Sequence, residues 1–168
     1  MTESCHKLIL SIFVGLWCGF SVGCSYGLVK VPTGAMEPTI PTDSYVAWRP
    51  IANAGHEVER FDLVIHTVPF DEKRRLLGEN ESSRYIFRVV GLGGEEIAIR
   101  DGLLFINGTR MPEPFERVAS DDNFGPIAIP EGEYFLLGDN RPASNDSRSW
   151  NPSTIRKERI IGEVVWIF

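Results

Sequence analysis

Cysteine is confined to the first 24 residues of this 168-residue chain, as Cys5, Cys18 and Cys24. Residues 25–168 therefore cannot form a disulfide among themselves, and they cannot supply a cysteine-based zinc site or a cysteine nucleophile. These absences exclude a disulfide scaffold, a cysteine-type zinc domain and a cysteine protease for the main body of the chain.

Basic residues and histidine are also scarce. Lys and Arg number 17 against 23 Asp and Glu, which gives a formal net charge of −6. Binding to nucleic acid requires clustered positive charge, so we expect no nucleic-acid partner. The three histidines are scattered along the chain, so the sequence predicts no metal site, and we expect no cofactor. A composition of 43% apolar and 24% charged residues is typical of a folded protein.

Charge is absent from residues 8–29, a run of 22 positions that Lys7 and Lys30 bound. A helix of this length spans a hydrocarbon core of about 30 Å. We therefore predict an uncleaved transmembrane anchor at 8–29, preceded by a short tail at 1–7. A cleaved signal peptide, or a lipoprotein signal ending at Cys24, is the alternative.

The domain that follows the anchor is predicted to span residues 30–168. Charges near the amino terminus favour an inside location for the tail, although Lys30 opposes it. We therefore expect a single-pass protein of the plasma membrane, with the domain on its outer, periplasmic or extracellular, face.

Residues after Lys30 follow the two-residue period of β-strands. Turn residues such as Asp101-Gly102 and Asn107-Gly108 separate the runs, and the segment 96–108 predicts a hairpin. Strands do not alternate with helices, so we predict a mostly β fold, an antiparallel barrel or sandwich behind the anchor. The polar segment 70–84 is expected to form an exposed excursion. The predicted strands are 45–48, 62–68, 85–92, 96–100, 103–108, 133–137 and 160–168.

Three segments carry the chemical interest: VPTGAMEPT (31–39), YIFRVVGLGGEE (85–96) and GDNRPASNDSR (138–148). In order and spacing they resemble the motifs of type I signal peptidases, membrane-anchored serine endopeptidases of peptidase family S26 that remove signal peptides from exported proteins. The third segment matches the family pattern GDNRxxSxDSR at every fixed position. These positions are Gly138, Asp139, Asn140, Arg141, Ser144, Asp146, Ser147 and Arg148.

The catalytic dyad of the family is replaced in this chain. The family's first motif is PSGSMEPT, and Ala35 stands at the position of its nucleophilic second serine. The family's lysine base directly precedes RVVG, and Phe87 stands there. Alanine has no hydroxyl and phenylalanine accepts no proton, and losing such a nucleophile–base unit costs a serine protease about a million-fold in rate. We favour natural divergence over an engineered inactivation, because exchanging Lys for Phe is not a usual knock-out.

No other residue is an obvious substitute for the dyad. The hydroxyl of Thr33 matches a family serine that resembles an oxyanion-hole donor, and a shift of two residues along an extended strand moves it about 6–7 Å. His66 lies on a predicted strand and could approach the site, but a lone histidine is more often a core residue. None of the lysines stands at the base position.

The resemblance also implies supporting and binding roles. Ser144 would hydrogen-bond the ammonium group that is missing here, Asp146 and Arg148 would pair to brace the loop, and Asp139 and Arg141 would support the same loop. Residues that match the small apolar pockets for Ala-x-Ala cleavage sites are Val29, Val31, Met36, Tyr85 and Ile86. The peptide would add as a strand beside residues 29–35.

The sequence therefore predicts a pseudoenzyme of the signal peptidase I family, which binds signal peptides, preproteins or membrane partners, including an active paralogue, without cleaving them. One alternative is an active signal peptidase that uses an unrecognised nucleophile. Another is a structural assembly factor that no longer binds peptide. On a strand running through Tyr85, Phe87 and Val89, we expect the Phe87 ring to fill the core.

Overall fold

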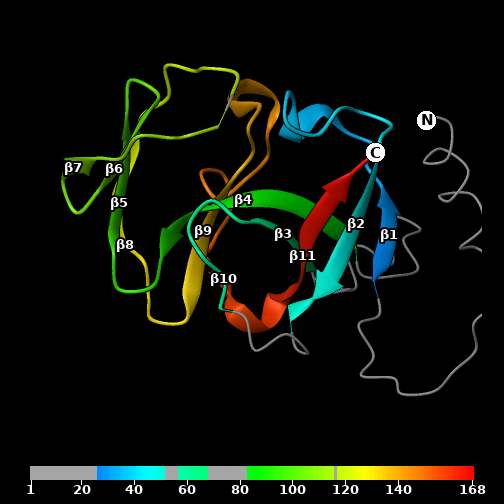
Figure 1. Cartoon of the computed structure of the whole chain (residues 1–168). Helices are drawn as coiled ribbons and strands as arrows, with labels where there is room; N and C mark the ends of the chain where they lie inside the picture. The colour runs from blue at the N-terminus through cyan, green and yellow to red at the C-terminus, as the bar shows by residue number, and fades with distance from the viewer. Residues whose placement is uncertain (1–25, 52–56, 68–82, 116) are drawn as a thin grey trace, which may run out of the picture.

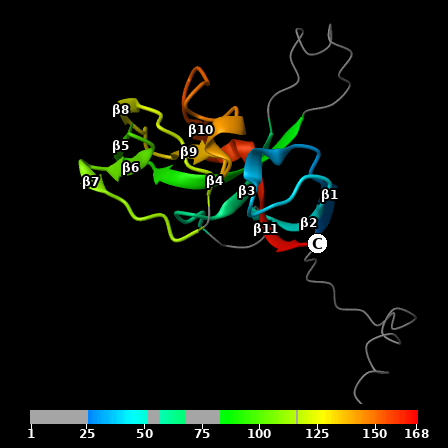
Figure 2. The ribbon, with the colours of Figure 1, turned by 90° about the horizontal axis from the view of Figure 1, so that it is seen from above.

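The computed structural model describes residues 26–51, 57–67, 83–115 and 117–168. The described chain forms a mostly β fold with two antiparallel sheets, as the sequence predicts (Figure 1). Seen from above, one end of the molecule holds β1, β2 and β11, and the other holds β5 to β8 (Figure 2).

The larger sheet has seven strands in the order β1-β2-β11-β3-β4-β9-β10. Every neighbouring pair is antiparallel, and β4 is the longest strand with nine residues. The bounds are β1 Gly27–Lys30, β2 Tyr45–Pro50, β3 Leu63–Thr67, β4 Arg84–Leu92, β9 Glu133–Leu137, β10 Ile155–Arg156 and β11 Ile160–Ile167. Short 3-10 helices connect these strands as η1 Gly34–Met36, η3 Arg141–Ala143 and η4 Lys157–Arg159.

The smaller sheet has four strands in the order β7-β6-β5-β8, with bounds β5 Glu96–Arg100, β6 Leu103–Ile106, β7 Thr109–Arg110 and β8 Phe124–Ala128. The predicted hairpin is confirmed as β5 and β6, which pair in register across Asp101 and Gly102. Both turn residues have positive φ, 49° and 70°, which is the geometry that a tight two-residue hairpin requires.

Two hydrophobic clusters fill the fold, and β4 contributes to both. Phe87 and Val89 belong to the cluster under the larger sheet, whereas Val90 belongs to the cluster under the smaller sheet. A shift in the β4–β9 register between Val89 and Gly91 accompanies this change of side. Strand β4, which carries most of the second motif, is therefore fixed by packing on both sides.

The structure revises the predicted boundary of the anchor. Gly27–Lys30 is strand β1, because it pairs antiparallel with Tyr45–Trp48 of β2, and the absence of a side chain at Gly27 leaves room for the Trp48 indole. The strand therefore includes the last three residues of the predicted helix, and residues 8–25 lie outside the described part. Among the described residues, no helix is long and apolar enough to cross a membrane.

Some segments differ from the expected strand pattern. Residues 70–82 of the predicted excursion at 70–84 lie outside the described part of the chain. Its last residue, Arg84, is the first residue of β4. Strand β8 was not predicted, because Gly125-Pro126 in its middle weakens the strand pattern. Proline is tolerated there since β8 is the last strand of its sheet.

Candidate functional site

Hydrogen bonds dock the loop of the third motif directly onto the first motif. The backbone N–H of Asn140 donates to the Ala35 carbonyl at 3.0 Å, and its side-chain amide donates to the Gly34 carbonyl at 3.0 Å. A Cβ at Gly138 would overlap with both the Ala35 carbonyl and the Ser144 hydroxyl. Glycine at 138 therefore lets Ala35 and Ser144 approach the same short stretch of backbone.

A buried ion pair joins the second motif to the same loop. Arg88, which follows Phe87 on β4, donates from Nε to Asp139 Oδ1 at 2.8 Å and from Nη2 to Asp139 Oδ2 at 2.5 Å. Only 7% of Arg88 and 1% of Asp139 are exposed, and Thr39 of the first motif also donates to Asp139. One carboxylate thus holds all three motifs together.

The predicted pair of Asp146 and Arg148 is confirmed. Arg148 donates from Nε and Nη2 to the two oxygens of Asp146, both at 2.8 Å, and Asp146 also accepts the Gly138 N–H at 3.1 Å. Arg141 is buried, donates from Nε to the Gly138 carbonyl at 3.1 Å and pairs with Glu113. Glu113 was missed at the sequence level, since nothing in its spacing from Arg141 connects the two.

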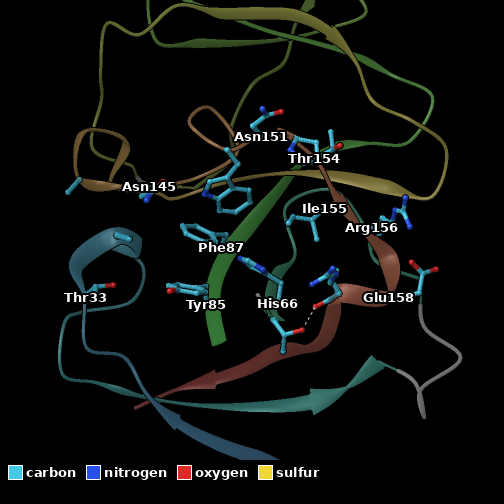
Figure 3. Close-up of a pocket in the computed structure, with 16 residues that line it drawn as sticks. Thr33, His66, Tyr85, Phe87, Asn145, Asn151, Thr154, Ile155, Arg156 and Glu158 are labelled. Atoms are coloured by element: carbon cyan, nitrogen blue, oxygen red, sulfur yellow. Dashed lines mark hydrogen bonds between the residues drawn. The ribbon is translucent and has the colours of Figure 1, made fainter. Parts of the chain in front are cut away.

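A cavity of about 1160 Å³ opens beside these motifs. Figure 3 shows His66, Tyr85 and Phe87 near its centre, with Thr33 and Asn145 on one side and Arg156 and Glu158 on the other. The complete lining is Thr33, Ala35, His66, Thr67, Tyr85, Phe87, Ala143, Asn145, Trp150, Asn151, Pro152, Thr154, Ile155, Arg156, Glu158 and Arg159. The sequence did not single out the wall from Trp150 to Arg159.

Ala35 and Phe87, which stand at the positions of the family's nucleophile and base, both line this cavity. The Phe87 ring is 4% exposed, stacks on His66 with ring centroids 5.6 Å apart and meets Trp150 edge-on at 5.4 Å. This confirms the prediction that Phe87 fills the core. The described lysines are Lys30 and Lys157, and neither lines the cavity.

The Ser144 hydroxyl is buried and has no hydrogen-bond partner among the described residues. A buried polar group without a partner costs about 1–3 kcal/mol, so native proteins rarely keep one. By the family resemblance, this hydroxyl would bind the ammonium group of the base, whose position Phe87 occupies.

His66 on β3 also lacks partners. It is 1% exposed, and neither ring nitrogen has a hydrogen-bond partner in the described ranges. Burial lowers the pKa of His66 to about 4. The nearby Thr67 backbone opposes this shift in part, although it does not meet the geometry of a hydrogen bond to the ring, and the positive charge of Arg159 adds to the shift. The imidazole is therefore neutral at pH 7.

The residues predicted to line small apolar pockets fall into two groups. Tyr85 is 39% exposed and lines the cavity. Val31 and Met36 are 5% and 1% exposed and belong to the core, and Val29 and Ile86 are partly buried and pack against it. Among the described side chains, no group of three His, Cys, Asp or Glu residues could hold a metal ion.

The antiparallel β fold, the three docked motifs and the loop braced by Asp146 and Arg148 define a domain of the signal-peptidase class. A sequence model described as "Signal peptidase, peptidase S26" matches residues 5–168. The chain therefore belongs to the signal peptidase I family, peptidase S26.

Signal peptidase I T of Bacillus subtilis (strain 168) is 31% identical to this chain over 148 residues, which are 82% of this chain and 71% of that protein. A probable signal peptidase I-2 of Synechocystis sp. is 28% identical over 132 residues, and the match spans 79% of this chain and 58% of that protein's length. A crystal structure of a signal peptidase I from Enterococcus faecalis V583 superposes with a TM-score of 0.48 at 27% identity, over 66% of this chain and 98% of that chain.

Proposed function

We propose that this chain is a signal-peptidase-family protein that binds signal peptides or other membrane-associated peptides and does not cleave them. The observation that carries the proposal is the pair Ala35 and Phe87 on the cavity wall. A serine hydroxyl attacks a peptide carbonyl only when a base removes its proton, and neither group is available at these positions. The motifs that would hold a substrate around them are retained.

The retained cavity supports peptide binding. Thr33 and Ala35 contribute one wall, and Tyr85 and Phe87 contribute another. An extended peptide that entered between these walls would place its side chains in the cavity. The strand addition expected beside residues 29–35 cannot extend along Gly34–Met36, because this segment is a 3-10 helix and the Gly34 and Ala35 carbonyls already accept hydrogen bonds from Asn140. The buried Arg88–Asp139 pair keeps the two walls in register without any contribution from the lost dyad.

The proposal includes a membrane location. Residues 8–25, which precede the described domain, contain no charged side chain. A membrane anchor there would hold the cavity near the outer membrane surface, where signal peptides and an active paralogue would be found.

One observation favours a second candidate, an active peptidase with a different nucleophile. Thr33 lines the cavity and carries a hydroxyl two residues before Ala35. This candidate requires a base for Thr33, and His66 is the cavity residue whose neutral imidazole could serve. Thr33→Val distinguishes the two candidates, because it would abolish cleavage of a preprotein only if Thr33 is the nucleophile.

The binding proposal is tested with the full chain in detergent and a fluorescent peptide ending in an Ala-x-Ala sequence. Ala143 is exposed and lines the cavity, so Ala143→Trp is expected to occupy part of the cavity and weaken binding about tenfold or more. Ala128 is exposed on β8 of the smaller sheet, so Ala128→Trp is the matched control and should leave the affinity unchanged. Absence of binding by the unmodified chain, or equal weakening by both variants, would contradict the proposal.

A further inference from the structure

The ring nitrogens of His66 are the most costly unexplained polar atoms of the cavity wall. The His66 side chain lines the cavity but is only 1% exposed. Neither of its ring nitrogens is hydrogen-bonded within the described structure. Three aromatic rings surround it, with centroid distances of 5.7 Å to Tyr85, 5.6 Å to Phe87 and 5.3 Å to Trp150. The two nitrogens do not reach the cavity surface, so a ligand group contacts the imidazole only when Tyr85 or Trp150 moves aside. Such a group would satisfy an otherwise unpaired donor or acceptor.

The charges around His66 restrict that ligand group. A cationic group would meet Arg159, whose positive charge acts on His66, and Arg156 on the same wall. An anionic group would bind best to a protonated imidazole, which burial disfavours. Glu158 contributes the remaining charge of the lining and opposes an anion as well. A neutral hydroxyl fits both ring nitrogens, because it can donate to one or accept from the other.

The rest of the cavity favours a large side chain. Its volume of about 1160 Å³ far exceeds the needs of an alanine methyl group, and Phe87, Trp150 and Tyr85 provide aromatic surface. Aromatic rings pack well against such a wall in edge-on or offset arrangements.

Resting on the proposed peptide-binding function, we propose that His66 is a specificity-determining residue and that the cavity receives a tyrosine side chain, whose ring packs on the aromatic wall and whose hydroxyl hydrogen-bonds the His66 imidazole. This chain would thus select a peptide with a large hydroxylated side chain where its relatives in the family select alanine.

The test is a thermodynamic cycle between ligand and protein. Signal peptides carrying Tyr, Phe or Ala in turn at each alanine of the Ala-x-Ala sequence are titrated into the full chain and into His66→Phe. At one of the two positions we expect Tyr to bind the unmodified chain about tenfold more tightly than Phe, since one hydrogen bond is gained. In His66→Phe, which keeps an aromatic ring and removes both nitrogens, Tyr and Phe should bind equally.

A second measurement covers the case in which His66→Phe fails to fold. Ring nitrogen resonances of His66 in the unmodified chain should shift on binding the Tyr peptide and stay in place with the Phe peptide. Equal affinities of the unmodified chain for Tyr and Phe, a Tyr preference that survives in His66→Phe, or tightest binding of the Ala peptide would overturn the assignment of His66 while leaving the proposed function intact. Failure of every peptide to bind would overturn both.

Discussion

Combining Ala35→Ser with Phe87→Lys in one chain is expected to produce cleavage of preproteins, whereas either change alone is not. Serine at 35 would sit on η1, fixed by the hydrogen bond from Asn140 to the backbone carbonyl of residue 35. Lysine at 87 would lie next to the Trp150 and His66 rings, where desolvation lowers an amine's pKa toward that of a base. By the family resemblance, the Ser144 hydroxyl, which has no hydrogen-bond partner among the described residues, would bind the introduced amine.

The expected gain is large because nucleophile and base act as a unit. Loss of either member costs a serine protease about 10⁶-fold, so the double variant should exceed both single variants by at least about 10³-fold in cleavage rate. The measurement is the rate of preprotein processing at a fixed enzyme concentration. Adding Ser144→Ala to the double variant should lower the rate again. Strong cleavage by Ala35→Ser alone would show that another base serves, and His66→Phe in that background would identify it.

Phe87→Ala is expected to lower the free energy of unfolding by about 3–5 kcal/mol. The ring is 4% exposed and packs against His66 and Trp150, so its removal leaves a cavity in the core under the larger sheet. Denaturant unfolding of the full chain in detergent, followed by tryptophan fluorescence, measures the change.

Tyr85→Ala is the matched control for this prediction. Tyr85 lies on the same strand and the same side as Phe87, but 39% of it is exposed, so its loss should cost about 1 kcal/mol or less. A cost below 1 kcal/mol for Phe87→Ala would mean that the ring can leave the core, and the position would then act in the groove instead of in packing.

Local patterns predicted most of the sheet but not its edges. The apolar, β-rich runs of β3, β4 and β9 and the Asp101-Gly102 turn are local signals, and the structure confirms the strands and the hairpin that they predict. The edge strands β1 and β8 were missed because their signals are ambiguous. Gly27–Lys30 continues an apolar run that also suits a helix, and Gly125-Pro126 interrupts the pattern of β8.

The site was predictable as far as its motifs reach. Ala35 and Phe87 were identified from their neighbours in the sequence, and the pairing of Asp146 with Arg148 followed from the family pattern. The wall from Trp150 to Arg159 was not predictable, because it contacts the motifs only after η4 and β11 fold back against β3. The ion pair between Asp139 and Arg88 was not predictable either, because the two residues are 51 positions apart in the sequence.

The central claim is that the unmodified chain holds a signal peptide and leaves it intact, and mass spectrometry of a preprotein incubated with the full chain tests it most directly. The double variant Ala35→Ser/Phe87→Lys serves as the positive control for a productive assay. We expect the preprotein to remain at full mass with the unmodified chain over a time in which the double variant processes it. Cleavage after the Ala-x-Ala sequence by the unmodified chain, lost in Thr33→Val, would contradict the account and establish Thr33 as the nucleophile.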